Sequence, residues 1–146
     1  MMPLALALAV LLVLIAALHA YWGIGGIWPG NDQASCARAV VGFRGVAVMP
    51  SPVACFAVTA MILAASLLAL ALGGFFATPF ERRPLAGAAL FVGLVFLGRG
   101  IAGFTPAWRR LAPEMPFASL DIRYYSPLCL LIGAGFVVLA VEGFAG

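Results

Sequence analysis

The sequence predicts an all-α membrane protein, a four-helix transmembrane bundle whose helices run up, down, up and down. The first observation is composition: 65% of the 146 residues are hydrophobic and 9% are charged, whereas about a quarter of a soluble domain is charged. The second is that the apolar residues form four runs, each near the ~20 residues that a helix needs to cross a bilayer. The runs cover about 3–22, 52–77, 85–106 and 126–144, in a single domain of residues 1–146.

The first run is apolar throughout until His19, near its end. Tyr21 and Trp22 then stand where aromatic side chains favour a membrane interface, and the glycine- and proline-rich stretch around Trp28 predicts a turn. A signal peptide is the alternative, but the segment has no basic start and its apolar part is too long. We therefore expect a membrane span with an aromatic end.

The connection over 31–50 is polar and long for a link between helices, and such loops are often functional. A short interfacial helix is expected over 35–41, where it carries Arg38. The second run begins at a proline, which the first turn of a helix tolerates. Its many alanines allow close approach of a neighbouring helix, so this run is expected to be scaffold.

The third run carries Arg99 between Gly98 and Gly100. An arginine inside a membrane span costs roughly 2.5–3.5 kcal/mol on insertion scales. It therefore needs a partner, a wet cavity or a ligand. The neighbouring glycines leave room for another backbone or for a ligand beside the guanidinium.

The fourth run opens with Ser126 and Pro127. Serine is a favoured N-cap and proline suits the first helical position, so we expect the helix to begin there with Ser126 as its cap. The loop before it contains Asp121, the acidic residue that stands nearest to this helix start.

The first and third connections lie on the same face of an antiparallel four-helix bundle, and most polar and aromatic side chains belong to that face. We expect His19, Trp22, Arg99 and Tyr125 to lie there in one layer. The candidate ligand-binding residues on this face are His19, Tyr21, Trp22, Trp28, Arg99, Asp121 and Tyr125.

Several classes of function find no support in the sequence. It has no catalytic or nucleotide-binding motif, and its arginines sit in short loops rather than in one stripe for nucleic acid. One histidine, no acidic cluster and three scattered cysteines predict no metal site and no cofactor. If this face lies in an oxidising compartment, Cys36 and Cys55 are the cysteines that can form a disulfide. Membrane lipid is the expected partner; protein partners and oligomeric state are open.

Arg99 allows two interpretations. It can form a buried ion pair with Asp121, or it can anchor an anionic or carbonyl-bearing ligand through its planar fork. The first functional hypothesis is a binding or carrier-type membrane protein whose pocket holds a lipid- or quinone-like molecule. The alternatives are a small enzyme acting on a lipid or quinone with His19 as base, and an accessory subunit of a larger membrane complex.

Four segments together resemble a family of small bacterial four-helix membrane proteins, domain of unknown function 3995. The segments, in order, are HAYWGIGGIWP, VVGFRGVAVMPSPVACFAV, LGRGIAGF and PFASLDIRYYSPLCLLIGAGF. The resemblance implies a multi-pass protein of the bacterial cytoplasmic membrane and no activity. Relatives often begin with a basic tail, whereas this chain begins MMPLAL.

The arginine count leaves the orientation open. The first and third connections hold five arginines, which points them to the cytoplasm, while Arg82 and Arg83 crowd the short second connection. Following the resemblance, we expect both termini in the cytoplasm and the first connection outside.

Overall fold

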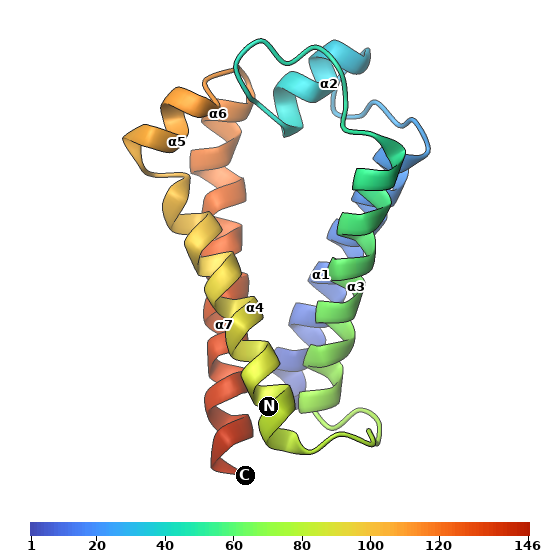
Figure 1. The fold of residues 1–146 in the computed structure, drawn as a ribbon, viewed down its shortest axis with the longest axis vertical. Helices are drawn as coiled ribbons and strands as arrows, with labels where there is room; N and C mark the ends of the chain where they lie inside the picture. The colour runs from blue at the N-terminus through green and yellow to red at the C-terminus, as the bar shows by residue number, and fades with distance from the viewer.

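The computed structural model describes residues 1–146 and is built of helices alone (Figure 1). Four segments are long and apolar enough to cross a membrane, which confirms the predicted all-α class and is consistent with a transmembrane bundle. They are α1 (Met2–Gly23), α3 (Pro52–Leu72), α4 (Arg82–Ala102) and the segment Phe117–Ala145. In this last segment α6 (Phe117–Leu120), the π-helix η1 (Asp121–Tyr125) and α7 (Ser126–Ala145) follow one another without a break.

The connections at one end of the spans contain their own short helices, while both chain termini lie at the other end (Figure 1). The expected interfacial helix is α2 (Gln33–Val40), and α5 (Pro106–Leu111) follows α4. Asp32 caps α2, because its Oδ1 accepts a hydrogen bond of 2.7 Å from the Ser35 amide. Thr105 caps α5 in the same way. These caps satisfy amides that would otherwise lack partners at the helix starts.

Two spans, α3 and α4, end sooner than their apolar runs. The helix α3 ends at Leu72, because Gly74 then adopts a φ of 77° that favours glycine. The helix α4 ends at Ala102, since Thr105 and Pro106 start a new helix. Arg99 therefore lies in the last turn of α4 rather than deep within a span that continues to residue 106. A cation is favoured there by the helix dipole.

The four spans pack as two pairs, α1 with α3 and α4 with α7. The pairs meet at the end that holds the termini and diverge toward α2 (Figure 1). Where they meet, large side chains from three spans, including Leu12, Leu72 and Phe136, fill a core together with small alanines. The short α2 and the segments beside it lie across the divergent end.

Each span places a row of side chains on the face that forms the core, and the row continues beyond it. On α1 the core residue Leu12 is followed by Ile15 and, four residues later, by His19. On α4, Phe96 packs against the core and Arg99 follows three residues later. Spacings of three and four keep side chains on one helical face. The residues reached in this way are His19 and Trp22 on α1, Val58 and Cys55 on α3, and Arg99 on α4.

Candidate ligand site

Arg99 forms an ion pair with Asp121, and it is the only ion pair in the protein. Its Nη2 donates to Asp121 Oδ1 over 2.7 Å. The Asp121 side chain is 2% exposed, while that of Arg99 is 30% exposed. The carboxylate is thus enclosed by protein, and the guanidinium keeps one accessible side.

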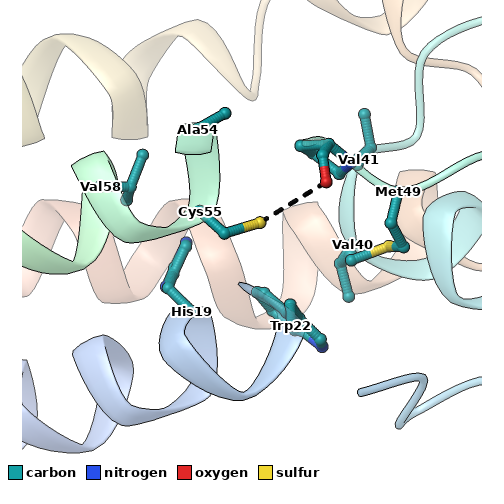
Figure 2. A pocket seen from close by; sticks show the side chains of 9 residues that line it. His19, Trp22, Val40, Val41, Met49, Ala54, Cys55 and Val58 are labelled. Carbon is teal, nitrogen blue, oxygen red and sulfur yellow. Dashed lines mark hydrogen bonds between the residues drawn. The ribbon is translucent and has the colours of Figure 1, made fainter. Parts of the chain in front are cut away.

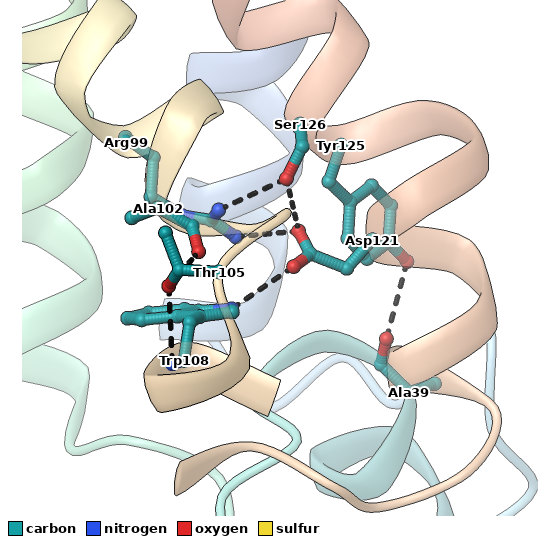
Figure 3. Close-up of polar contacts among 8 residues, drawn as sticks. All are labelled: Ala39, Arg99, Ala102, Thr105, Trp108, Asp121, Tyr125 and Ser126. Carbon is teal, nitrogen blue, oxygen red and sulfur yellow. Dashed lines mark hydrogen bonds and ion pairs between the residues drawn. The ribbon is translucent and has the colours of Figure 1, made fainter. Parts of the chain in front are cut away.

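Two further side chains complete the network around this pair (Figure 3). Ser126 Oγ accepts a hydrogen bond of 3.3 Å from Arg99 Nη1 and donates one of 3.1 Å to Asp121 Oδ1. Trp108 Nε1 donates to Asp121 Oδ2 over 2.9 Å, and its ring lies 4.5 Å from the guanidinium carbon. Asp121 therefore receives three hydrogen bonds, two of them on one oxygen, and Arg99 gains a cation–π contact besides.

Backbone geometry brings these side chains together from four elements, α4, α5, η1 and α7. Asp121 begins the π-helix η1, and the wider turn lets the Ser126 hydroxyl reach back five residues to it. Gly103 directly follows α4 at the point where Ser126 approaches, and a Cβ on Gly103 would overlap the Ser126 Oγ. The helix α5 then turns Trp108 back over Arg99. A residue larger than glycine at position 103 would keep α4 away from the network.

Ser126 differs from its predicted role. It was expected to cap a helix that begins at Ser126, but the chain is already helical before it, and no side-chain cap is present there. Its backbone amide is therefore part of a continuing helix, and its hydroxyl is free to join Arg99 and Asp121. Pro127 is accommodated within this continuous segment.

His19 and Trp22 line a separate small pocket of about 160 Å³ (Figure 2). Their rings make an edge-on contact with centroids 5.1 Å apart, as expected for residues on one helical face. His19 Nδ1 lies 2.9 Å from the Ile15 carbonyl oxygen. Because a carbonyl oxygen only accepts, Nδ1 carries the proton and a neutral ring has Nε2 as its acceptor. The other lining residues are Val40, Val41, Met49, Pro50, Ala54, Cys55 and Val58.

The remaining aromatic candidates tie the first connection to the spans. Trp22 Nε1 donates to the Trp28 carbonyl oxygen over 2.7 Å, and the Trp28 amide donates to the Tyr21 hydroxyl over 3.3 Å. Tyr125 donates from its hydroxyl to the Ala39 carbonyl oxygen over 3.1 Å (Figure 3). Tyr21, Trp28 and Tyr125 thus have structural contacts of their own.

The seven candidate residues fall into distinct groups. Arg99 and Asp121 share one network, His19 and Trp22 share the pocket, and the pocket lining contains no residue of α4 or α7. Ligand binding by these residues and their arrangement in one layer stay predictions. The sequence analysis did not place Ser126 and Trp108 beside Arg99. The available signal for Ser126 was its closeness in sequence to Asp121, at the start of the fourth run.

Every fully buried side-chain nitrogen and oxygen has a hydrogen-bond partner. The network itself therefore has no buried polar atom that needs a ligand. No group of three or more histidine, cysteine, aspartate or glutamate side chains is placed to hold a metal ion. All three cysteines are free thiols. What the arrangement can offer chemically is a fixed, partly accessible guanidinium and one imidazole acceptor.

Two titratable groups of the first connection have shifted pKa values. The hydrogen bonds that Asp32 accepts from Ser35 lower the pKa of Asp32. Burial raises the pKa of the Cys36 thiol, which is fully enclosed. Cys36 is therefore protonated at neutral pH and shielded from aqueous reagents, which makes it a poor probe for the orientation of this connection.

Comparison of the sequence with known protein families identifies the family of this chain. The model of a family described as "Protein of unknown function (DUF3995)" matches residues 12–136 of the chain. No curated protein and no solved structure matches. The match confirms the resemblance seen in the four sequence segments and carries no activity with it.

Proposed function

We propose that this multi-pass membrane protein, a member of the DUF3995 family of proteins of unknown function, binds a small amphipathic molecule. The molecule would bind at the accessible side of Arg99, on the face of the first and third connections. Its polar group would meet Arg99, and its apolar part would lie along the half-buried inner faces of the spans.

The observation that carries this proposal is the unequal exposure of the ion pair. Asp121 is 2% exposed and Arg99 is 30% exposed. A guanidinium has five N–H groups, two of them make the bonds to Ser126 and Asp121, and three remain for another acceptor. Asp121, Ser126 and Trp108 hold the guanidinium in one orientation, so little side-chain entropy is lost when a ligand binds.

The charge balance favours an uncharged acceptor as the polar group. Asp121 already neutralises Arg99, so a full anion would bring an uncompensated negative charge into a site of low dielectric. A carbonyl or ester oxygen accepts a hydrogen bond from the guanidinium without that cost. The candidate ligands thus narrow from anionic or carbonyl-bearing molecules to carbonyl-bearing ones, such as a lipid ester or a quinone.

His19 supplies the second polar contact on the opposite helix pair. It lies on the same face of α1 as the core residues and borders a pocket with mostly apolar walls. With Nδ1 donating to Ile15, Nε2 can accept a hydrogen bond from a ligand hydroxyl. Trp22 would provide an apolar wall beside it.

The membrane and its orientation belong to the same proposal. Following the resemblance in the four sequence segments, the protein would lie in the bacterial cytoplasmic membrane with both termini in the cytoplasm. Because Cys36 is enclosed, the informative probes in a cysteine-free protein are Ala47→Cys, in the first connection, and Ala77→Cys, in the second; both positions are exposed. Labelling of Ala47→Cys alone by an impermeant reagent in intact cells is expected, and labelling of Ala77→Cys alone would reverse the orientation.

Native mass spectrometry of the gently extracted protein tests ligand binding. We expect a retained molecule that carries a carbonyl group. Arg99→Lys should keep the ion pair with Asp121 but lower the retained fraction about tenfold, because an ammonium lacks the planar fork. Arg82→Lys is the matched control, since Arg82 lies at the opposite end of α4 and donates to a backbone carbonyl, that of Leu72.

A double variant separates anchoring from folding. Arg99→Met with Asp121→Leu removes both charges and is expected to fold without the guanidinium. If this variant retains the molecule as well as the wild-type protein does, Arg99 is not the anchor. A wild-type protein that carries no small molecule would count against a resident ligand.

A further inference from the structure

A second polar surface lies at the corner between α5 and α6, apart from the network around Arg99. A depression of about 330 Å³ is found there. It combines two arginines with apolar and small side chains. Its lining residues are Arg109, Met115, Ala118, Ser119, Ile122 and Arg123.

The two arginines of this depression have no carboxylate partner. The one ion pair of the protein joins Arg99 to Asp121. The other acidic residue of the corner, Glu114, accepts a hydrogen bond of 2.9 Å from the Gly45 amide. Arg109 and Arg123 are both exposed. The depression therefore presents two uncompensated positive charges.

The position of the depression matches the headgroup level of a membrane. Arg109 belongs to α5, which follows the end of α4 closely, and Arg123 belongs to the segment that continues into α7. Large apolar side chains near it are exposed: Leu111 is 55%, Met115 is 62% and Tyr124 is 61% exposed. Arginines beside exposed apolar and aromatic side chains are typical of an element that lies in the membrane interface.

We infer that this depression binds the phosphate group of an anionic phospholipid from the surrounding leaflet. The forks of Arg109 and Arg123 suit phosphate oxygens, and the Ser119 hydroxyl can donate a further hydrogen bond. Met115 and Ile122 offer apolar contact to the glycerol backbone and the first acyl carbons. The site differs in charge from the neutralised pair at Arg99, so the two sites would select different molecules.

Native mass spectrometry in a nonionic detergent, with added phosphatidylglycerol or phosphatidylcholine, tests this inference. The wild-type protein should bind phosphatidylglycerol about tenfold more tightly, because two arginines near the membrane surface favour an anionic lipid. Arg109→Gln with Arg123→Gln should remove that preference. Arg109→Lys with Arg123→Lys keeps both charges and should keep it. Both positions are exposed, so the helical content and melting temperature should not change.

The matched control is Arg82→Gln with Arg83→Gln, the arginine pair at the other end of the spans. If this control lowers the preference as much as the pair at positions 109 and 123, binding depends on overall charge and the site is refuted. A wild-type protein without preference between the two lipids refutes it as well. Displacement of the lipid by millimolar inorganic phosphate would overturn the assignment to a membrane lipid in favour of the free ion.

Discussion

The two helix pairs reach close packing by different means. In the pair α4–α7, Gly93 faces Gly133, and a Cβ on Gly133 would lie 2.8 Å from the Gly93 carbonyl oxygen. The pair α1–α3 packs through alanines and through hydroxyl groups that donate to the backbone of the other helix. Ser66 donates to the Ala9 carbonyl oxygen over 3.2 Å, and Thr59 donates to that of Ala16 over 3.4 Å.

This difference indicates which helix pair is held more firmly in one geometry. Apolar area alone does not drive helices together in lipid, so close backbone approach and polar contacts must do so. The α4–α7 pair has both, and its divergent end is fixed by the network of Arg99, Asp121, Ser126 and Trp108. The α1–α3 pair packs through alanines, has only neutral hydrogen bonds between its helices, and borders an apolar pocket. We therefore expect substitutions in α4–α7 to have the larger effects.

The largest effect is expected for Gly133→Leu. Its side chain would have to enter the contact between α7 and the backbone of α4 at Gly93 and Leu97. Because a backbone cannot move aside as a side chain can, the loss should exceed the ~1–3 kcal/mol typical of overpacking. Thermal melting in one detergent measures it. Gly98→Leu is the control, since a Cβ there meets no atom within 4 Å; an equal loss for both would contradict the close α4–α7 contact.

The next effect concerns the ion pair. Arg99→Met should lower the free energy of unfolding by about 3 kcal/mol, the lower end for breaking a buried pair because Arg99 is partly exposed. The loss arises from the orphaned Asp121 carboxylate. Adding Asp121→Leu should recover most of it, which the same melts would show as a strong non-additivity.

Two results would contradict this reading of the pair. If Arg99→Met is as stable as the wild-type protein, the enclosed carboxylate does not depend on its partner. If Asp121→Leu fails to rescue Arg99→Met, the loss comes from the contact of the arginine with Trp108 instead.

A smaller effect is expected for Tyr125→Phe. The change removes the hydrogen bond to the Ala39 carbonyl oxygen but keeps the ring contact with Phe117, whose centroid is 5.7 Å away. We expect a loss of about 1 kcal/mol. The amides of α2 should exchange hydrogen faster in the variant. Unchanged exchange in α2, with α3 as internal reference, would show that the bond does not hold α2 to the α4–α7 pair.

The smallest effect is expected for Ser66→Ala in the α1–α3 pair. The alanine fits the buried site, and the Ala9 carbonyl oxygen it leaves lies within α1. Neutral hydrogen bonds between helices in a membrane average about 0.6 kcal/mol. Melts of this variant beside Arg99→Met test the comparison directly. Losses of similar size in both would mean that the two helix pairs do not differ as proposed.

The sequence alone determined the four spans, the shared face of the first and third connections, and the need of Arg99 for a partner. These follow from local properties: the length of apolar runs, the alternation of direction, and the cost of a charge in lipid. Asp121 was already a candidate partner because the third connection lies on the same face as the polar end of the third run.

Only the tertiary structure decided which partners enclose Asp121 and how the spans are grouped. Ser126 reaches Asp121 through the π-helix, and Trp108 returns over Arg99 through α5. Arg99 meets Asp121 and Ser126 because α4 approaches α7 closely at Gly103, and no spacing along one helix reveals that approach. The grouping into α1–α3 and α4–α7 likewise arises because small residues on different helices meet in space, and hydrophobicity alone does not choose between neighbours in a membrane.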